Sequence, residues 1–206
     1  ARVIRHDPAL DRLIAPDARL ETLASGFTWS EGPVWIADGG YLLFSDVPEN
    51  RIHRWSEKDG VSVFMEPSGY DGPDASVFRE PGSNGLIAAP RGSILMADHG
   101  ARAIARVDLA TRAKTLLATR YGDARFSSPN DLVQASNGAI FFTDPPYGLK
   151  EMDRSPLKET AYNGVYRLDP DGVVTLLDDS LSFPNGIGLS PDQRTLYVAE
   201  IGRAHV

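Results

Sequence analysis

One short pattern occurs four times along this chain of 206 residues and limits what the chain can fold into. Each copy begins with Glu or Asn, continues through Gly or Asp into a short apolar stretch, makes a turn, and ends a second apolar stretch in an acid. A self-similar unit that recurs about every 50 residues is the signature of a β-propeller blade. The first residues of the copies are Glu31, Asn84, Asn130 and Asn185, at intervals of 53, 46 and 55 residues, and the closing acids are Asp46, Asp98, Asp144 and Glu200.

Two further strand-like stretches follow in each of the first three copies. In the first copy, residues 51–55 and 61–65 flank a turn that contains Asp59-Gly60, which is a hairpin signal. A complete unit therefore has four strands, whereas the fourth copy stops after its second strand. We predict an all-β chain that holds about three and a half blades of a propeller. The equivalent pairs in the second and third copies are residues 103–107 with 114–118, and 164–168 with 173–177.

Three segments outside the strands of the repeat carry their own expectations. Alternating residues at 20–24 favour a short N-terminal strand. Residues 67–81 and 145–163 are longer than turns, and long connections on a repeat scaffold are typical of a binding face. We expect a binding role for the start of the second connection, which follows a strand end directly. Its charged part, residues 150–154, is expected to form a solvated loop or a short helix.

The charge and composition of the chain argue against several classes of protein. The net charge of −7 argues against binding to nucleic acid or to an anionic membrane surface. The sequence has no run of about 18 apolar residues that could span a bilayer. It contains no cysteine, so neither a disulfide framework nor a thiol nucleophile is available, and the cytoplasm and the periplasm both stay open as the compartment of a soluble protein.

The repeated polar residues point to a site. Equivalent residues of successive blades surround one axis, so Glu31, Asn84, Asn130 and Asn185 should converge at one mouth of the central channel. One carboxylate with neutral amide oxygens suits a hard divalent cation, Ca²⁺ first and Mg²⁺ next, with Mn²⁺ or Zn²⁺ as further possibilities. The alternative is that these residues only serve the turns in which they lie.

Six motifs, in this order, resemble the SMP-30, gluconolactonase and luciferin-regenerating-enzyme-like family, and the resemblance runs from about Leu13 to Glu200. It implies a six-bladed propeller that holds one divalent cation and hydrolyses sugar lactones. The family's metal ligands match Glu31, Asn130 and Asn185. Its fourth ligand, an Asp one blade later that is also the favoured base, would fall beyond this sequence, which leaves the catalytic base unassigned. The motifs are Ser-Glu-Gly-Pro-Val-Trp at 30–35, Ser-Asn-Gly-Leu at 83–86, Ala-Asp-His-Gly at 97–100, Ser-Pro-Asn-Asp at 128–131, Phe-Thr-Asp-Pro-Pro-Tyr-Gly at 142–148 and Pro-Asn-Gly-Ile at 184–187.

Four more residues are candidates for contact with a substrate. Asn84 could touch substrate or a metal-bound water, or only serve the turn before a glycine. His99 could line the pocket as a donor or proton carrier, or be structural. Asp144 and Tyr147 are candidates because the motif that contains them begins the second long connection. The other acids at strand ends are expected to accept backbone N–H groups from the neighbouring blade.

The resulting hypothesis is a metal-dependent hydrolase that opens a small sugar lactone, such as a gluconolactone, to its aldonic acid. One alternative is a non-catalytic propeller that binds a protein or peptide on one face. Another is an enzyme that hydrolyses aryl esters or phosphotriesters at the same metal. The polar residues Glu31, Asn130 and Asn185 at one register favour an enzyme, because a scaffold has no need of ligand-capable groups there.

The C-terminal end departs from the repeat. Ile201 to Val206 does not continue the third-strand pattern, and it reads as the translation of a common sequencing adapter, although a natural tail is the alternative. We therefore expect residues 1–206 to form the N-terminal part of a single propeller domain, with 201–206 as a non-native tail. On its own, such a fragment is expected to be inactive, since open blade faces and the absent ligand would impair it.

Overall fold

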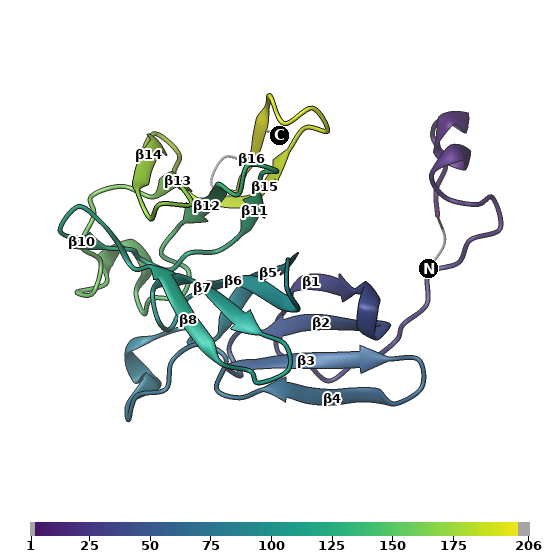
Figure 1. The fold of residues 1–206 in the computed structure, drawn as a ribbon, viewed down its shortest axis with the longest axis horizontal. Coiled ribbons are helices and arrows are strands. Elements are labelled where there is room, and N and C mark those ends of the chain that lie inside the picture. The colour runs from purple at the N-terminus through teal and green to yellow at the C-terminus, as the bar shows by residue number, and fades with distance from the viewer. Residues whose placement is uncertain (1–2, 202–206) are drawn as a thin grey trace.

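The protein is built almost entirely from antiparallel sheets. The structure is a computed structural model that describes residues 3–201, so most of the expected non-native tail lies outside the described residues. Three sheets of four strands and a fourth of two strands follow one another in chain order around an arc (Figure 1). The prediction of three and a half blades is confirmed.

Within each blade the strands pair in sequence order, each antiparallel to the next. This up-and-down order follows from the short turns that join the strands, such as the one at Asp59 and Gly60 between the third and fourth strands. The blades are β1 (Ser30–Ile36), β2 (Tyr41–Asp46), β3 (Arg51–Ser56) and β4 (Gly60–Met65); β5 (Ser83–Ala89), β6 (Ser93–Asp98), β7 (Ala103–Asp108) and β8 (Lys114–Ala118); β11 (Leu132–Gln134), β12 (Ile140–Asp144), β13 (Gly164–Leu168) and β14 (Val174–Asp178); and β15 (Pro184–Leu189) with β16 (Leu196–Glu200).

Short elements occupy the remaining segments. The hairpin of β9 (Arg120–Tyr121) and β10 (Ala124–Arg125) lies between the second and third blades and was not predicted. Four 3-10 helices complete the described residues: η1 (Pro8–Arg12), η2 (Ala37–Gly39), η3 (Ala75–Val77) and η4 (Met152–Arg154). The last of these lies in the charged segment for which a loop or short helix was expected.

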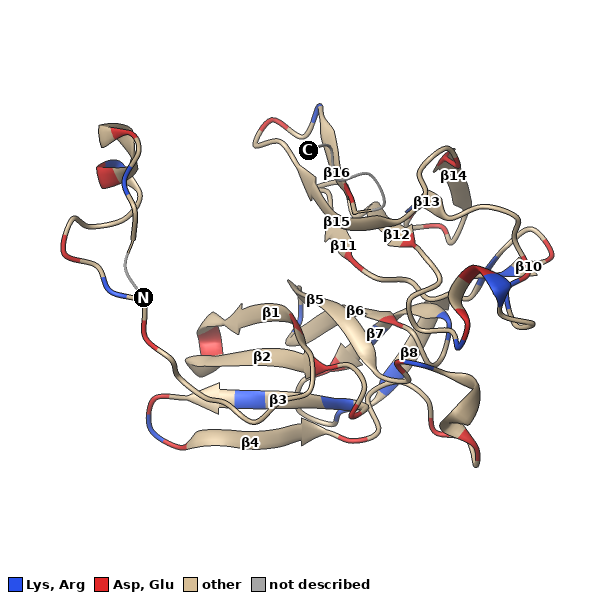
Figure 2. Ribbon diagram, turned by 180° about the vertical axis from the view of Figure 1, so that it is seen from behind, with Lys and Arg blue, Asp and Glu red and all other residues tan. Residues whose placement is uncertain are grey.

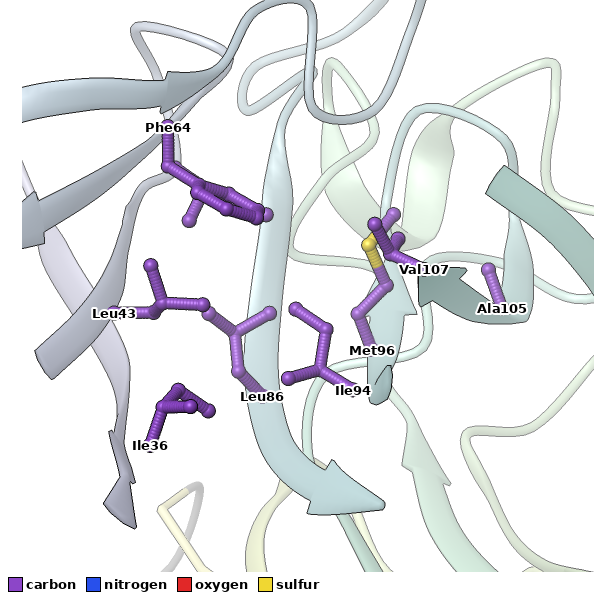
Figure 3. Close-up of a cluster of buried hydrophobic side chains, with 9 residues drawn as sticks. Ile36, Leu43, Phe64, Leu86, Ile94, Met96, Ala105 and Val107 are labelled. Carbon is purple, nitrogen blue, oxygen red and sulfur yellow. The ribbon is translucent and has the colours of Figure 1, made fainter. Parts of the chain in front are cut away.

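The hydrophobic core fills the spaces between neighbouring blades. Figure 3 shows Leu43 and Phe64 of the first blade pointing toward Leu86, Ile94 and Met96 of the second. A second cluster joins the second and third blades around residues such as Phe126, Phe142 and Tyr166. Full burial of each large apolar side chain contributes about 1.5–3 kcal/mol, so packing of blade on blade is the main stabilising force.

The first strands of the blades lie side by side at the inner edge of the arc. β1 contacts β5, β5 contacts β11, and β11 contacts β15. The approach is close enough to require glycine: a Cβ on Gly32, whose φ is +54°, would lie 2.2 Å from the carbonyl oxygen of Asn84. This succession of inner strands places the repeated polar residues together.

The predicted N-terminal strand at 20–24 is wrong. Residues 17–29 form no strand, and the side chains of Leu20 and Leu23 are 63% and 51% exposed. Alternation of residue types cannot by itself make a strand, because a strand also needs a partner edge for its backbone groups. The 3-10 helix η1 lies apart from the sheets in Figure 1.

The two long connections lie against each other. Phe78 and Leu149 form an isolated antiparallel bridge, and the N–H of Lys150 donates to the carbonyl oxygen of Val77 at 3.1 Å. The N–H groups of Arg79 and Glu80 both donate to the carbonyl oxygen of Gly148, at 2.9 and 3.3 Å. These bonds fix two irregular segments that would otherwise be mobile.

Acidic and basic positions are interspersed over the described strands and loops (Figure 2). Among residues 3–201, no helix is long and apolar enough to cross a membrane.

Candidate functional site

The inner strands of the four blades enclose a cavity of about 390 Å³. Glu31, Asn84, Asn130 and Asn185 all line it, one from each successive blade, as their common register predicted. Asp131 lines it as well. The four residues that the repeat aligns in sequence are therefore neighbours in space.

Backbone oxygens of the three asparagines are each held by the preceding blade. Ser45 Oγ donates to the carbonyl oxygen of Asn84 at 2.9 Å. The N–H of Gly85 donates to the carbonyl oxygen of Asn130 at 2.8 Å. Thr143 Oγ1 donates to the carbonyl oxygen of Asn185 at 2.8 Å. Each blade thus fixes the position of the site residue in the next one.

The side chains of two of these asparagines are also joined directly. Asn84 and Asn130 are buried, with 5% and 3% of their surfaces exposed, and Asn84 Nδ2 donates to Asn130 Oδ1 at 2.9 Å. Glu31 is only partly buried, and its Oε1 accepts from Trp29 Nε1 at 3.1 Å. Two rigid amides and a more accessible carboxylate therefore line one wall of the cavity.

Asp131 ties the third blade to the fourth. Its Oδ1 accepts from the N–H of Leu132 at 2.9 Å, and its Oδ2 accepts from the N–H of Ile187 at 3.0 Å. Burial raises the pKa of Asp131, and these N–H donors oppose that rise. Asp131 stands where the other copies of the repeat have Gly, which is a signal in the sequence for a special role.

His99 lies behind the wall of the cavity rather than on it. The side chain is fully buried, with its Nε2 3.5 Å from Asn84 Nδ2 and its Nδ1 3.6 Å from Glu80 Oε2. Burial lowers the pKa of His99 to about 4. Burial raises the pKa of Glu80, which lies in a loop without a repeat counterpart, so no pattern in the sequence points to it.

Asp144 serves as a backbone clamp away from the cavity. It is fully buried, and its two oxygens accept the N–H groups of Ser127 and Ser128, each at 2.8 Å. Asp46 accepts the N–H groups of Thr28 and Trp29 in the same way, at 3.0 and 2.9 Å. For Asp46, the expectation of bonds from a neighbouring blade is wrong, since Asp46, like Asp144, binds the segment that enters the inner strand of its own blade.

Asp98 is an exception among these clamps. One of its oxygens accepts from the N–H of Ala101 at 2.8 Å, and the other lies 2.9 Å from Lys114 Nζ. The ammonium group also donates to the carbonyl oxygens of Ser68 and Gly69, at 3.1 and 2.9 Å. The ion pair between Asp98 and Lys114 stands in place of one of the two backbone N–H bonds that Asp46 and Asp144 each accept.

Tyr147 lies beside the fourth blade. Its Oη donates to the carbonyl oxygen of Phe183 at 3.3 Å, and the two rings stack with centroids 6.0 Å apart. Burial raises the pKa of Tyr147, whereas a hydrogen bond with the side chain of Asn185 lowers it by a smaller amount. The phenol therefore stands next to one of the residues that line the cavity.

The donor set of the cavity fits a hard cation. Residues 3–201 contain no group of three or more His, Cys, Asp or Glu side chains that could hold a metal ion, so a cation would depend on amide oxygens as well. Glu31, Asn130 and Asn185 supply one carboxylate and two such oxygens. Asn130 Oδ1 accepts one N–H and keeps a second lone pair, as a ligand requires. Oxygen-only sets of this kind suit Ca²⁺ or Mg²⁺.

Several known proteins with similar sequences or folds are named lactonases. The family profile described as the SMP-30/Gluconolactonase/LRE-like region matches residues 29–205. A gluconolactonase of Zymomonas mobilis is 48% identical over 98% of this chain and 57% of its own length. The pentonolactonase XacC of Haloferax volcanii is 28% identical over 82% of this chain and 49% of its own. This chain thus spans about half the length of these curated relatives.

The fold of this chain is also similar to that of a solved gluconolactonase structure. A gluconolactonase from Xanthomonas campestris superposes with a TM-score of 0.79 at 38% identity, over 95% of this chain and 62% of that one. The overlap covers the four blades and therefore the strands that carry the cavity residues.

Proposed function

The chain belongs to the SMP-30/gluconolactonase/LRE-like family, and from that premise we propose that the protein containing it is a metal-dependent lactonase. The proposed reaction opens a sugar lactone, such as a gluconolactone, to its aldonic acid. The observation that carries the proposal is the convergence of Glu31, Asn130 and Asn185 from three blades on one cavity. Similarity to a gluconolactonase at 48% identity supports the same substrate class.

In this proposal Glu31, Asn130 and Asn185 hold a divalent cation, Ca²⁺ first and Mg²⁺, Mn²⁺ or Zn²⁺ as alternatives. When bound, such a cation polarises the carbonyl oxygen of the lactone and stabilises the negative charge that develops there. Glu31 is the only charged member of the set, so a dication keeps net positive charge for this purpose. The backbone carbonyl oxygens of Asn130 and Asn185 accept hydrogen bonds from the preceding blades, so the backbone that carries the two neutral amides is already held in place.

The same cavity offers groups for recognition of the substrate. The amide of Asn84 lies on its wall, and Tyr147 stands next to Asn185. Neutral donors and acceptors of this kind suit the hydroxyl groups of a sugar. His99 and Asp144 are proposed to act only through other residues, because both are fully buried.

The direct test uses the whole protein that contains this sequence. The purified protein is stripped of metal with a chelator, and acid release from glucono-1,5-lactone is followed at constant pH before and after addition of Ca²⁺. We expect hydrolysis to disappear and return. Hydrolysis that persists fully in stripped protein would contradict a role for metal. Turnover of aryl esters or phosphotriesters but not of sugar lactones would favour the alternative chemistry, and no turnover of any of these would favour a scaffold.

A further inference from the structure

A line of four buried polar side chains runs from a loop into the wall of the cavity. Its members are Glu80, His99, Asn84 and Asn130, and their exposed fractions are 8%, 0%, 5% and 3%. The consecutive polar atoms lie 3.6, 3.5 and 2.9 Å apart. Buried polar groups without partners are costly, so a continuous line of this kind needs an explanation.

The backbone holds His99 and Glu80 firmly in place. The N–H of His99 donates to the carbonyl oxygen of Gly82 at 3.2 Å, and the N–H of Glu80 donates to that of Gly148 at 3.3 Å. A Cβ on Gly148 would come within 2.7 Å of His99 Cβ, so the second long connection packs directly on the imidazole. The two side chains are therefore fixed by the paired loops rather than by a strand of the repeat.

The hydrogen-bonding capacities of these groups determine which atom donates and which accepts at each contact along the line. An amide nitrogen can only donate, so the imidazole Nε2 that faces Asn84 Nδ2 must accept. A buried neutral imidazole with an accepting Nε2 carries its proton on Nδ1, and that nitrogen makes no hydrogen bond within the described residues, with Glu80 Oε2 3.6 Å away. Both amide hydrogens of Asn84 are then used, one toward His99 and one toward Asn130, and its Oδ1 remains for the cavity.

The opposite orientation of the Asn84 amide would be unfavourable. Its Oδ1 would lie against Asn130 Oδ1, so two acceptors would face each other at the contact that is now a hydrogen bond. At 3.5 and 3.6 Å, the two contacts of His99 are longer than a typical hydrogen bond of about 2.9 Å. Their role is therefore to select between two orientations of an amide rather than to bind strongly.

We propose that Glu80 and His99 are positioning residues that fix the orientation of the Asn84 amide. Asn84 then holds Asn130 Oδ1 in place for the cation and presents its own Oδ1 to a hydroxyl group of the substrate. The part of this inference that concerns the cation rests on the proposed function. Outer partners that orient a ligand in this way typically change metal affinity by about 10- to 100-fold when they are removed.

The first arm of the test does not depend on metal or activity. The ¹⁵N chemical shifts of the imidazole of His99, in the metal-free whole protein at neutral pH, show which nitrogen carries the proton. We expect a proton on Nδ1 and a proton-free Nε2 that accepts from Asn84. A proton on Nε2 would overturn the proposal, since the Asn84 amide would then have to face the other way.

The second arm measures Ca²⁺ affinity by calorimetry. His99→Phe keeps a ring but removes both nitrogens, and we expect it to weaken Ca²⁺ binding by about 10- to 100-fold. Glu80→Gln keeps an acceptor next to Nδ1, so a smaller loss is expected. His53→Phe is the matched control, because His53 is another buried histidine, on β3 and away from the line.

The outcomes separate this inference from the proposed function. Unchanged Ca²⁺ affinity in folded His99→Phe would overturn the positioning role even if the wild type is a lactonase. If the wild type binds no Ca²⁺, the proposed function fails, and the ¹⁵N shifts of His99 alone decide the orientation of Asn84. If His99→Phe unfolds, as its melting temperature would show, Glu80→Gln and the ¹⁵N shifts still decide.

Discussion

The hydroxyl group of Thr143 donates to the carbonyl oxygen of Asn185 at 2.8 Å and so joins the third blade to the fourth at the cavity. The same relationship joins Ser45 to Asn84 across the first two blades. In both cases the donor immediately precedes the acid at the end of its strand. A single hydroxyl therefore couples the packing of blades to the position of a proposed metal ligand.

Thr143→Val tests this coupling. The substitution keeps the shape but leaves the carbonyl oxygen of Asn185 without that donor, at a cost of about 1–3 kcal/mol in the free energy of unfolding. We expect weaker Ca²⁺ binding as well, measured by calorimetry on the whole protein. Thr143→Ser, which keeps the hydroxyl, should restore most of both. Thr115→Val at an exposed position of β8 is the control.

Glu31→Gln removes the only charge among the proposed ligands. We expect Ca²⁺ affinity and lactone hydrolysis at limiting Ca²⁺ to fall together, by about 10-fold or more, while the melting temperature of metal-free protein stays near that of the wild type. Glu57→Gln, at an exposed turn, controls for the loss of a negative charge. Wild-type hydrolysis by Glu31→Gln at limiting Ca²⁺ would remove Glu31 from the site.

Asn130→Ala distinguishes a ligand from a turn residue. It should abolish measurable Ca²⁺ binding, because it removes a ligand oxygen and frees the Asn84 amide that bonds to it. Asn130→Asp, which adds charge, should bind Ca²⁺ more tightly but hydrolyse lactone more slowly, since the cation is then less electrophilic. Asn137→Ala removes an asparagine that only bonds within its turn and serves as the control. Normal Ca²⁺ binding by Asn130→Ala would assign Asn130 to the turn alone.

Lys114→Met should destabilise the fold strongly. It leaves the fully buried carboxylate of Asp98 without its counter-charge, for which the expected cost is about 3–5 kcal/mol. The double variant Lys114→Met with Asp98→Asn should recover part of this stability, because the buried charge is then absent. Denaturant unfolding of the three proteins measures both effects. Equal stability of Lys114→Met and wild type would show that Asp98 is already protonated in the fold.

Asp144→Asn should change how stability depends on pH. Burial raises the pKa of Asp144 to about 7 from an ordinary value of 3.8, so the folded state binds the proton more tightly than the unfolded state. That stabilisation is complete below the ordinary value and is lost as pH rises toward 7. The wild type should therefore lose stability relative to Asp144→Asn across this range, measured by denaturant unfolding at several pH values. Parallel profiles would indicate that the two N–H bonds keep the carboxylate ionised throughout, and exposed Asp17→Asn provides the control.

The sequence alone determined the blades and the common register of the cavity residues. Repeated apolar stretches of strand length, separated by turns, can bury their apolar faces only by pairing within a unit and stacking on the next. Once that stacking is assumed, Glu31, Asn84, Asn130 and Asn185 must lie near one axis, because equivalent positions of stacked units are neighbours. These predictions needed only local patterning and contacts between adjacent repeats.

Tertiary structure alone decided what departs from the repeat. The contact of Glu80 with His99 depends on the path of an irregular loop, and the pairing of Lys114 with Asp98 has no counterpart in the other blades, so no periodic pattern encodes either of them. The same holds for residues 20–24, whose alternation predicted a strand but whose backbone finds no partner edge. Burial is also decided by the tertiary structure. His99 follows a strand end in the sequence, and in the fold its side chain is fully buried with Gly148 packed against it.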